Sequence, residues 1–129
     1  MNMRKIPVIL DADTGIDDTM ALLICATSSK LDVLAAVSTF GNTTIDYATQ
    51  NTMDVLALCG RQDIAVGMGA DRPWKKKLRT SPYIHGVNGI GEYQMPEHHR
   101  EALSPLPAWD LAYEKIMACP EKVTYVALG

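Results

Sequence analysis

The stretch that decides the fold is IPVILDADTGIDD, residues 6–18. Its first five residues are apolar without alternation, which predicts a strand that is buried on both faces. Four carboxylates follow within eight residues: Asp11, Asp13, Asp17 and Asp18. Like charges at the end of a buried strand repel one another and lose hydration, so a bound cation or a chemical role is needed to explain them. The alternative is that Asp17 and Asp18 only cap the next helix, while Asp11 and Asp13 are solvated.

Strands and helices alternate along the rest of the chain. Apolar runs predict further strands at 32–40, 64–68 and 123–128, and apolar residues at helical spacing predict helices at about 17–28, 44–59 and 109–117. We expect Thr14 or Asp17 to cap the first helix. The alternation predicts an α/β fold, a Rossmann-like open and mostly parallel sheet with flanking helices. With strand order 3-2-1-4, the last strand lies at an edge, so we expect residues 1–129 to be the N-terminal part of one larger α/β domain, apparently truncated after the fourth strand.

The composition limits the class of protein. The 129 residues are 47% hydrophobic and 21% charged, with a net charge of −3, which is typical of one compact domain. We expect no nucleic-acid partner, because no basic face is evident, and no membrane association. We interpret the three cysteines as small buried thiols in a reducing cytoplasm.

A long region rich in glycine and proline, residues 69–107, separates the third strand from the last helix. Loops of this length usually act as lids or binding loops, and we expect a mobile lid here. The basic run at 75–79 predicts a solvated loop. We expect His98 and His99 to be solvated and Trp109 to lie in the core.

Three separate pieces of sequence are expected to meet at one edge of the sheet. Ligands of open α/β sheets bind outside the carboxyl ends of the strands, where residues 11–18, Asn42 and Leu128 all follow strands. Carboxylate, amide and carbonyl oxygens suit calcium or magnesium and not zinc. Asp13 and Asp18 can embrace one ion, and a metal-bound water beside a carboxylate is a ready nucleophile.

Residues 8–18 resemble the N-terminal aspartate motif of the inosine-uridine preferring nucleoside hydrolases. The resemblance continues through residues 38–42, 84–91 and 123–129, in the order and approximate spacing of that family. It covers essentially the whole chain. One departure is Thr14, which stands where many family members carry proline.

The resemblance implies a Ca²⁺ cofactor and a set of ligands for it. Asp13 is implied as a calcium ligand and as the general base on the attacking water. Asp18 is implied to bind calcium through both carboxylate oxygens, and the carbonyl of Leu128 as a further ligand. Asp11 is implied to orient the loop.

The resemblance also implies how a ribonucleoside substrate is held. Asp17 is implied to hydrogen-bond the ribose hydroxyls, and Asn42 to position both the water and Asp13. His85, in the glycine-containing loop, is implied to contact the leaving group or the 5′ side of the substrate. The implied reaction is hydrolysis of the N-glycosidic bond to ribose and free base. We also expect a homo-oligomer. Since family members are more than twice this long, we expect this chain alone to show little hydrolysis and weak calcium affinity.

Two other functions stay open on the sequence alone. Asp11 and Asp13 after a buried strand superficially fit a phosphatase of the haloacid dehalogenase type, although that family has threonine or valine where this chain has Gly15. The chain is alternatively an inactive folded fragment or interaction module that assembles through its open sheet edge.

Overall fold

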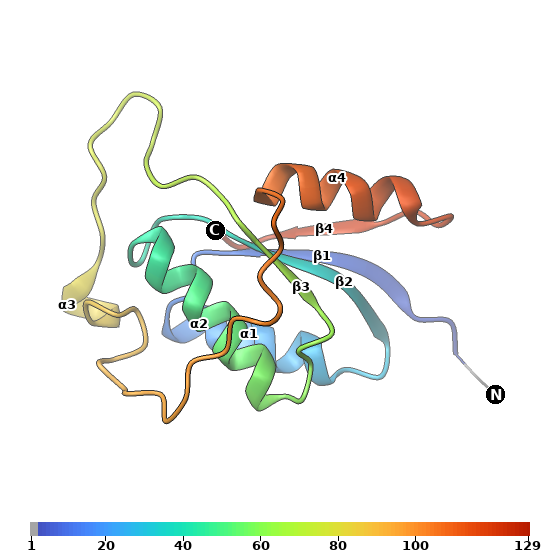
Figure 1. Ribbon diagram of the computed structural model, residues 1–129, viewed down its shortest axis with the longest axis horizontal. Helices are drawn as coiled ribbons and strands as arrows, with labels where there is room; N and C mark the ends of the chain where they lie inside the picture. Colours follow the sequence, from blue (N-terminus) through green and yellow to red (C-terminus); the bar gives the residue numbers. More distant parts are fainter. Residues whose placement is uncertain (1–2) are drawn as a thin grey trace.

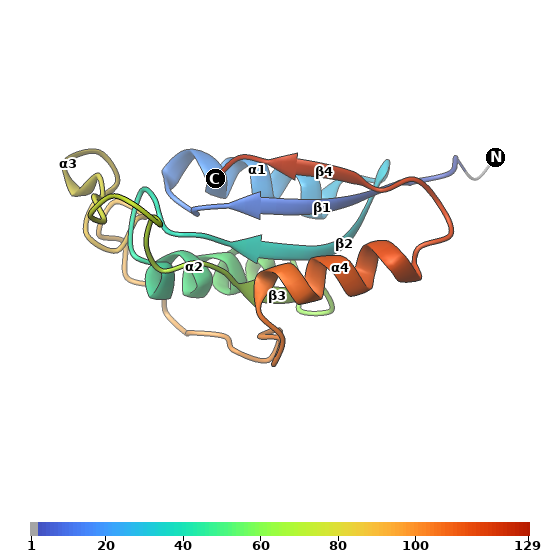
Figure 2. The ribbon, with the colours of Figure 1, turned by 90° about the horizontal axis from the view of Figure 1, so that it is seen from above.

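The fold is a four-stranded parallel sheet with helices on both faces (Figures 1 and 2). It was obtained as a computed structural model that describes residues 3–129. The strands are β1 (Ile6–Ala12), β2 (Leu31–Ser38), β3 (Ala65–Met68) and β4 (Thr124–Ala127). Their order is β3-β2-β1-β4, and every pair is parallel, as predicted. At the middle of β1, Leu10 pairs with Ala36 of β2 and with Val126 of β4.

The two faces of the sheet are covered by different helices. Helices α1 (Ile16–Thr27) and α2 (Ile45–Leu58) cover one face, and α4 (Ala108–Ala118) covers the other (Figure 2). Side chains of β1 alternate between these faces: Val8 and Leu10 pack in one core, and Ile9 packs in the other. Burial on both faces explains why this strand is continuously apolar.

The cap of α1 differs from the prediction. Its N-cap is Gly15, and no side chain of the cap residue bonds to the helix. Thr14 cannot serve, because its hydroxyl is fully buried and lies 2.7 Å from the hydroxyl of Thr52 on α2. Asp17 lies inside the first turn and cannot be the cap either.

The orientation of α4 also differs from the prediction. Trp109 is 62% exposed and does not belong to the core, whereas Ala108, Leu111 and Ala112 face the sheet. A Cβ atom at Gly67 of β3 would lie 2.8 Å from the Cα of Ala108. The helix therefore approaches the sheet so closely that small side chains face the strand and the large rings point outward.

Residues 69–107 contain structure of their own. They contain a short helix, α3 (Pro82–His85), and a return segment that runs beside β3, where Val66 pairs with Leu103. The side chain of His98 is 63% exposed, as expected, whereas His99 is half-buried. Both residues are attached to α2: Nδ1 of His98 lies 2.8 Å from the carboxylate of Asp54, and the backbone N–H of His99 donates to the same carboxylate at 2.7 Å.

The cysteines Cys25, Cys59 and Cys119 are half-buried, not fully buried. No helix within residues 3–129 has the length and apolar character needed to cross a bilayer.

Candidate active site

The carboxyl ends of three strands meet at one edge of the sheet, as the sequence predicted. The loop after β2 bonds to the end of β1, since the N–H of Thr39 donates to the carbonyl of Ala12 at 3.2 Å. The segment after β4 reaches the same place, since the N–H of Leu128 donates to the carbonyl of Asp11 at 2.8 Å. A Cβ atom at Gly129 would lie 3.2 Å from the backbone nitrogen of Asp13. The aspartate loop therefore lies between the other two segments.

Asp13 is held by the loop that follows β2. Its Oδ2 accepts a 2.7 Å hydrogen bond from the backbone N–H of Asn42. The neighbouring residue, Gly41, lies so close that a Cβ atom there would overlap the carboxylate of Asp13. One carboxylate oxygen is thus fixed in position by backbone.

Asp18 is a buried carboxylate with an unused oxygen. Its side chain belongs to the first turn of α1, and the residue is only 5% exposed. Within residues 3–129, its buried Oδ2 has no hydrogen-bond partner. Burial, the adjacent carboxyl of Asp13 and the charge of Asp17 raise the pKa of Asp18 to about 7. This environment favours either a proton or a cation at Asp18.

Asp17 and His85 lie side by side at the start of α1. Asp17 is largely exposed, and its Oδ1 lies 3.9 Å from Nδ1 of the buried His85. Nδ1 of His85 accepts a 3.1 Å hydrogen bond from the backbone N–H of Ile16. A ring that accepts at Nδ1 carries its proton on Nε2 when neutral. The local sequence does not indicate this cap on α1, because the residues that it joins are 69 positions apart.

Asn42 connects the aspartate loop to the segment that carries His85. Its N–H binds Asp13, and its carbonyl accepts a 3.0 Å hydrogen bond from the N–H of Ser81, the cap of α3. A Cβ atom at Gly15 would lie 2.6 Å from both the Asn42 side-chain amide and Nδ1 of His85. The lack of a side chain at residue 15 therefore lets these two groups converge.

Asp11 has a structural partner that the sequence did not indicate. The hydroxyl of Tyr125 on β4 donates to Oδ2 of Asp11 at 2.7 Å. Burial and the Asp11 carboxylate raise the pKa of Tyr125 above its ordinary value. Asp11 thus joins β4 to β1, which is compatible with the loop-orienting role implied for it.

The sequence profile described as "Inosine-uridine preferring nucleoside hydrolase" matches residues 8–129. This chain belongs to the inosine-uridine preferring nucleoside hydrolase family. The match excludes the phosphatase alternative, since it includes every site segment described above.

Curated members of this nucleoside hydrolase family resemble the chain over nearly all of its length. It is 33% identical to a probable uridine nucleosidase 2 of Arabidopsis thaliana over 95% of this chain and 38% of that protein. It is 31% identical to a non-specific ribonucleoside hydrolase of Klebsiella pneumoniae over 97% of this chain and 40% of that protein. The chain therefore spans about two fifths of the length of these relatives.

Solved nucleoside hydrolase structures share the fold. A plant nucleoside hydrolase superposes with a TM-score of 0.85 at 34% identity, covering 95% of this chain and 39% of the other. A purine-preferring ribonucleoside hydrolase from Gardnerella vaginalis superposes with a TM-score of 0.86 at 28% identity, covering 95% and 40%. These likenesses confirm the predicted fold class.

The nucleoside hydrolase site fits a hard cation only in part. The adjacent carboxylates of Asp13 and Asp18 and the unpaired Oδ2 of Asp18 are suitable oxygen donors. Within residues 3–129, however, no group of three or more Asp, Glu, His or Cys side chains is arranged to hold a metal ion. Since calcium takes about six to eight oxygens, these residues supply a minority of a coordination shell.

Proposed function

We propose that this nucleoside hydrolase site serves calcium-dependent hydrolysis of the N-glycosidic bond of ribonucleosides. The observation that supports it most is the buried, unpaired Oδ2 of Asp18 beside the carboxylate of Asp13. A buried carboxylate beside a second carboxylate, without a cation, loses free energy through desolvation and repulsion, so the arrangement is understandable if a cation compensates. We also propose that residues 1–129 form the N-terminal part of a single nucleoside hydrolase domain.

The proposed metal ligands are Asp13, Asp18 and the carbonyl of Leu128. When bound, calcium would acidify a water molecule and orient the ribose hydroxyls. Asp13 is proposed to accept the proton of the attacking water. The Asn42 N–H holds Oδ2 of Asp13 and so limits the rotation of this base, which preserves its orientation toward the substrate.

The proposed contacts to substrate come from α1 and from the lid side. The exposed carboxylate of Asp17 is available to accept hydrogen bonds from ribose hydroxyls. Its negative charge and that of Asp13 would stabilise the positive charge that develops on the ribose as the glycosidic bond breaks. The Nε2–H of His85 is proposed to donate to the leaving base or to the 5′ hydroxyl.

The proposed substrate class is a ribonucleoside, without a choice of base. The relatives carry names as different as uridine nucleosidase, pyrimidine-specific, non-specific and purine-preferring ribonucleoside hydrolase. Their shared feature is the ribonucleoside, and residues 11–18 and 42 are the part of this site that we assign to the ribose.

The decisive experiment is a calcium titration of the purified 129-residue chain, followed by amide chemical shifts. We expect millimolar calcium to shift the amides of residues 13–18 and 42 in the wild type but not in Asp18→Asn. An Asp32→Asn variant, changed at an exposed residue of β2, serves as the matched control and should respond like the wild type. An identical calcium response in Asp18→Asn would overturn the proposed ligand role.

A turnover assay completes the test. We expect inosine and uridine to be hydrolysed slowly or not at all by residues 1–129, because the coordination shell is incomplete. Turnover at the rates usual for enzymes would overturn the proposal that these residues are only part of the domain.

A folded, catalytically inactive module is the second candidate. The outward-facing large side chains of α4, Trp109, Tyr113 and Met117, and the edge position of β4 favour assembly with another chain. The same surfaces would serve the expected homo-oligomer. Light scattering after size exclusion, with melting curves in calcium and in chelator, distinguishes the inactive module from the calcium-dependent hydrolase. A metal-insensitive oligomer without turnover supports the module.

A further inference from the structure

One buried amide, the side chain of Asn51 on α2, joins the aspartate loop to residues 86–93, which we call the lid turn. The side-chain NH₂ of Asn51 donates to the carbonyl of Thr14 at 3.2 Å and to the carbonyl of Asn88 at 2.7 Å. Both partners are carbonyl oxygens, so only the nitrogen of the amide can face them. Thr14 follows Asp13 directly, and Asn88 lies in the middle of the lid turn.

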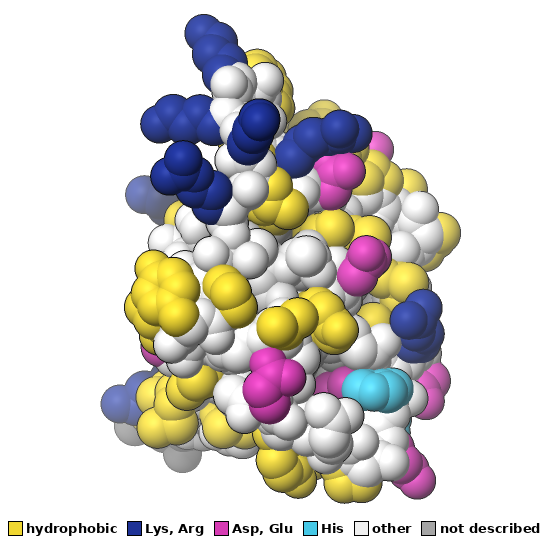
Figure 3. Space-filling model, turned by 90° about the vertical axis from the view of Figure 1, so that its left-hand side faces the viewer, with side chains coloured by type: hydrophobic (Ala, Val, Ile, Leu, Met, Phe, Trp, Pro, Cys, Tyr) yellow, Lys and Arg dark blue, Asp and Glu magenta, His cyan; other side chains and the backbone are white. Residues whose placement is uncertain are grey.

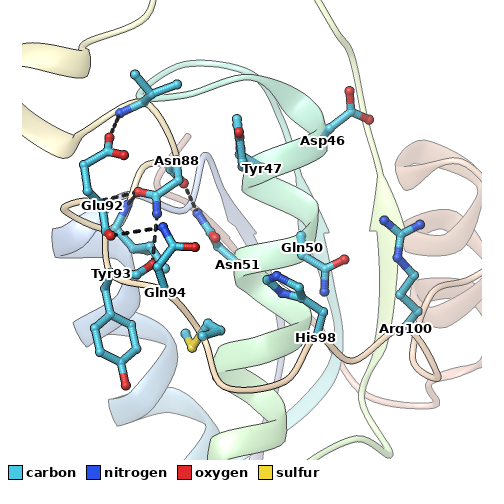
Figure 4. A pocket seen from close by; sticks show the side chains of 13 residues that line it. Asp46, Tyr47, Gln50, Asn51, Asn88, Glu92, Tyr93, Gln94, His98 and Arg100 are labelled. Carbon is cyan, nitrogen blue, oxygen red and sulfur yellow. Dashed lines mark hydrogen bonds between the residues drawn. The ribbon is translucent and has the colours of Figure 1, made fainter.

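The lid turn is held together by its own side chains (Figure 4). Oδ1 of Asn88 accepts hydrogen bonds from the N–H groups of Ile90 and Glu92, both at 3.0 Å, and its Nδ2 donates to the carbonyl of Tyr93. The carboxylate of Glu92 accepts a hydrogen bond from the N–H of Val87. Because these bonds are internal, the lid turn is built to move as one unit.

Few hydrogen bonds among the described residues attach this unit to α2 and to the loop that precedes it. Besides Asn51, the hydroxyl of Thr43 donates to the carbonyl of Val87 at 2.7 Å. The backbone at Gly89 packs so tightly here that a Cβ atom would lie 2.7 Å from Thr43 and 3.1 Å from Asn51. Beyond this point, a cavity of about 430 Å³ lies between α2 and residues 87–100 (Figure 4). The next attachment is the one between Asp54 and residues 98–99.

His85 is connected directly to the lid turn. Its carbonyl accepts a 2.7 Å hydrogen bond from the N–H of Gly91, and its ring accepts the N–H of Ile16. A displacement of the lid turn would therefore draw His85 away from α1. Figure 3 shows this side of the molecule: Lys and Arg side chains gather at the top, and acidic, hydrophobic and histidine side chains lie below them.

We propose that Asn51 is a positioning residue for the nucleoside hydrolase site. It touches no proposed ligand or substrate group, yet it fixes the distance between the loop of Asp13 and the lid turn, which follows His85 directly. The inference rests on the proposed function for its catalytic meaning, but the docking itself does not need metal or substrate. Loss of the Asn51 amide is expected to release the lid turn and the ring of His85 together.

The test is residue-resolved hydrogen exchange on the metal-free chain. Asn51→Ala removes two buried hydrogen bonds, so the N–H groups of Ile16 and Gly91 should exchange about tenfold faster, while amides of β1 and β2 stay as slow as in the wild type. Gln50→Ala is the matched control, because it removes an amide of the same kind from the Asp54 attachment. Gln50→Ala should leave the exchange rate of the Ile16 N–H unchanged.

Two results would overturn the inference. One is faster exchange at Gly91 with Ile16 unchanged, which separates the lid turn from His85. The other is an equal acceleration in β1 and β2, which makes Asn51 only a stabilising residue. If Asn51→Ala does not fold, hydrogen exchange of the wild type is the test. The free energies of opening for the N–H groups of Ile16 and Gly91 must then be equal, and unequal values reject the proposal. Calcium-induced shifts at Asp13 and Asp18, measured separately, report on the proposed function alone.

Discussion

Gly41 lies against the carboxylate of Asp13 so closely that no other residue fits there without displacing this carboxylate, the proposed general base. Its φ is not in the left-handed region, so the requirement for glycine is purely steric. Gly41→Ala should push the Asp13 carboxylate away from the N–H of Asn42 and destabilise the chain by about 1–3 kcal/mol. The shift of the Asn42 amide in an NMR spectrum, with a chemical denaturation curve, measures both effects.

Gly60→Ala is the control for this prediction. Gly60 has a φ of +68°, and a Cβ atom there would meet no neighbour. The alanine should destabilise the chain by about 1 kcal/mol through backbone strain alone. The Asn42 amide and the calcium response should remain those of the wild type; a change at Asn42 in this variant would mean that the shift reports general destabilisation.

Asp18→Asn should make the metal-free chain less sensitive to pH. The pKa of Asp18 is raised to about 7 in the fold, so the folded chain retains a proton that the unfolded chain has released. The contribution of Asp18 to the stability of the fold is therefore fully present below about pH 4 and is lost as the pH rises toward and through 7. Asparagine cannot ionise and can donate to Asp13, so the variant should be more stable by roughly 2 to 4 kcal/mol at pH 8 and similar at pH 4.

Melting temperatures across this pH range in the presence of a chelator measure the effect. Asp32→Asn, the exposed control, should follow the wild type at every pH. A parallel decline in wild type and Asp18→Asn would show that other groups cause it. Added calcium should raise the melting temperature of the wild type at pH 8 and leave that of Asp18→Asn unchanged.

Tyr125→Phe should weaken the attachment of β4 to β1. The variant removes the 2.7 Å hydrogen bond to Asp11 and leaves the ring in place, so we expect a loss of about 1–2 kcal/mol. Urea unfolding measures the loss. Since the pKa of Tyr125 is raised, its ionisation should also be the late component of an absorbance titration in alkali, and the variant should lack it. Tyr113→Phe, on the exposed side of α4, should retain that component.

Asp54→Asn should loosen residues 98–100 from α2. The buried carboxylate accepts hydrogen bonds from Gln50, from the N–H of His99 and from the ring of His98. An amide of the same size accepts fewer bonds, so we expect a loss of about 1–3 kcal/mol and faster proteolysis near residue 98. Asp63→Asn, at an exposed carboxylate paired with Arg61, should cost less than half as much. Equal losses would contradict a special role for Asp54.

The strand order and the meeting of the site segments were predictable because they follow from periodicity and chain connectivity. Continuous apolar runs such as residues 6–10 indicate strands buried on both faces, and parallel strands bring their carboxyl ends to one edge. Residues 11–18, Asn42 and Leu128 were placed together on that basis. No knowledge of side-chain packing was needed.

The remaining details depend on tertiary contacts that local sequence does not encode. Trp109 shares a helix with Ala108 and Ala112, and only the close approach of α4 to Gly67 decides which face turns inward. The local sequence does not distinguish Asp54 from other helix carboxylates, because its partners, residues 98 and 99, are distant in the chain. The cap that His85 provides for Ile16 joins residues 69 positions apart, which no local motif can show.

The lid turn passes through the left-handed region four times, at Gly86, Gly89, Gly91 and Glu92. Since residues other than glycine adopt such backbone angles only with strain, the three glycines have little freedom to vary. If the proposed function holds, a change of nucleobase preference would accordingly fall on the lid-turn side chains that are not glycine and make none of its internal hydrogen bonds, namely Val87, Ile90 and Tyr93. Libraries randomised at those three codons alone would sample specificity while leaving the architecture of the loop intact.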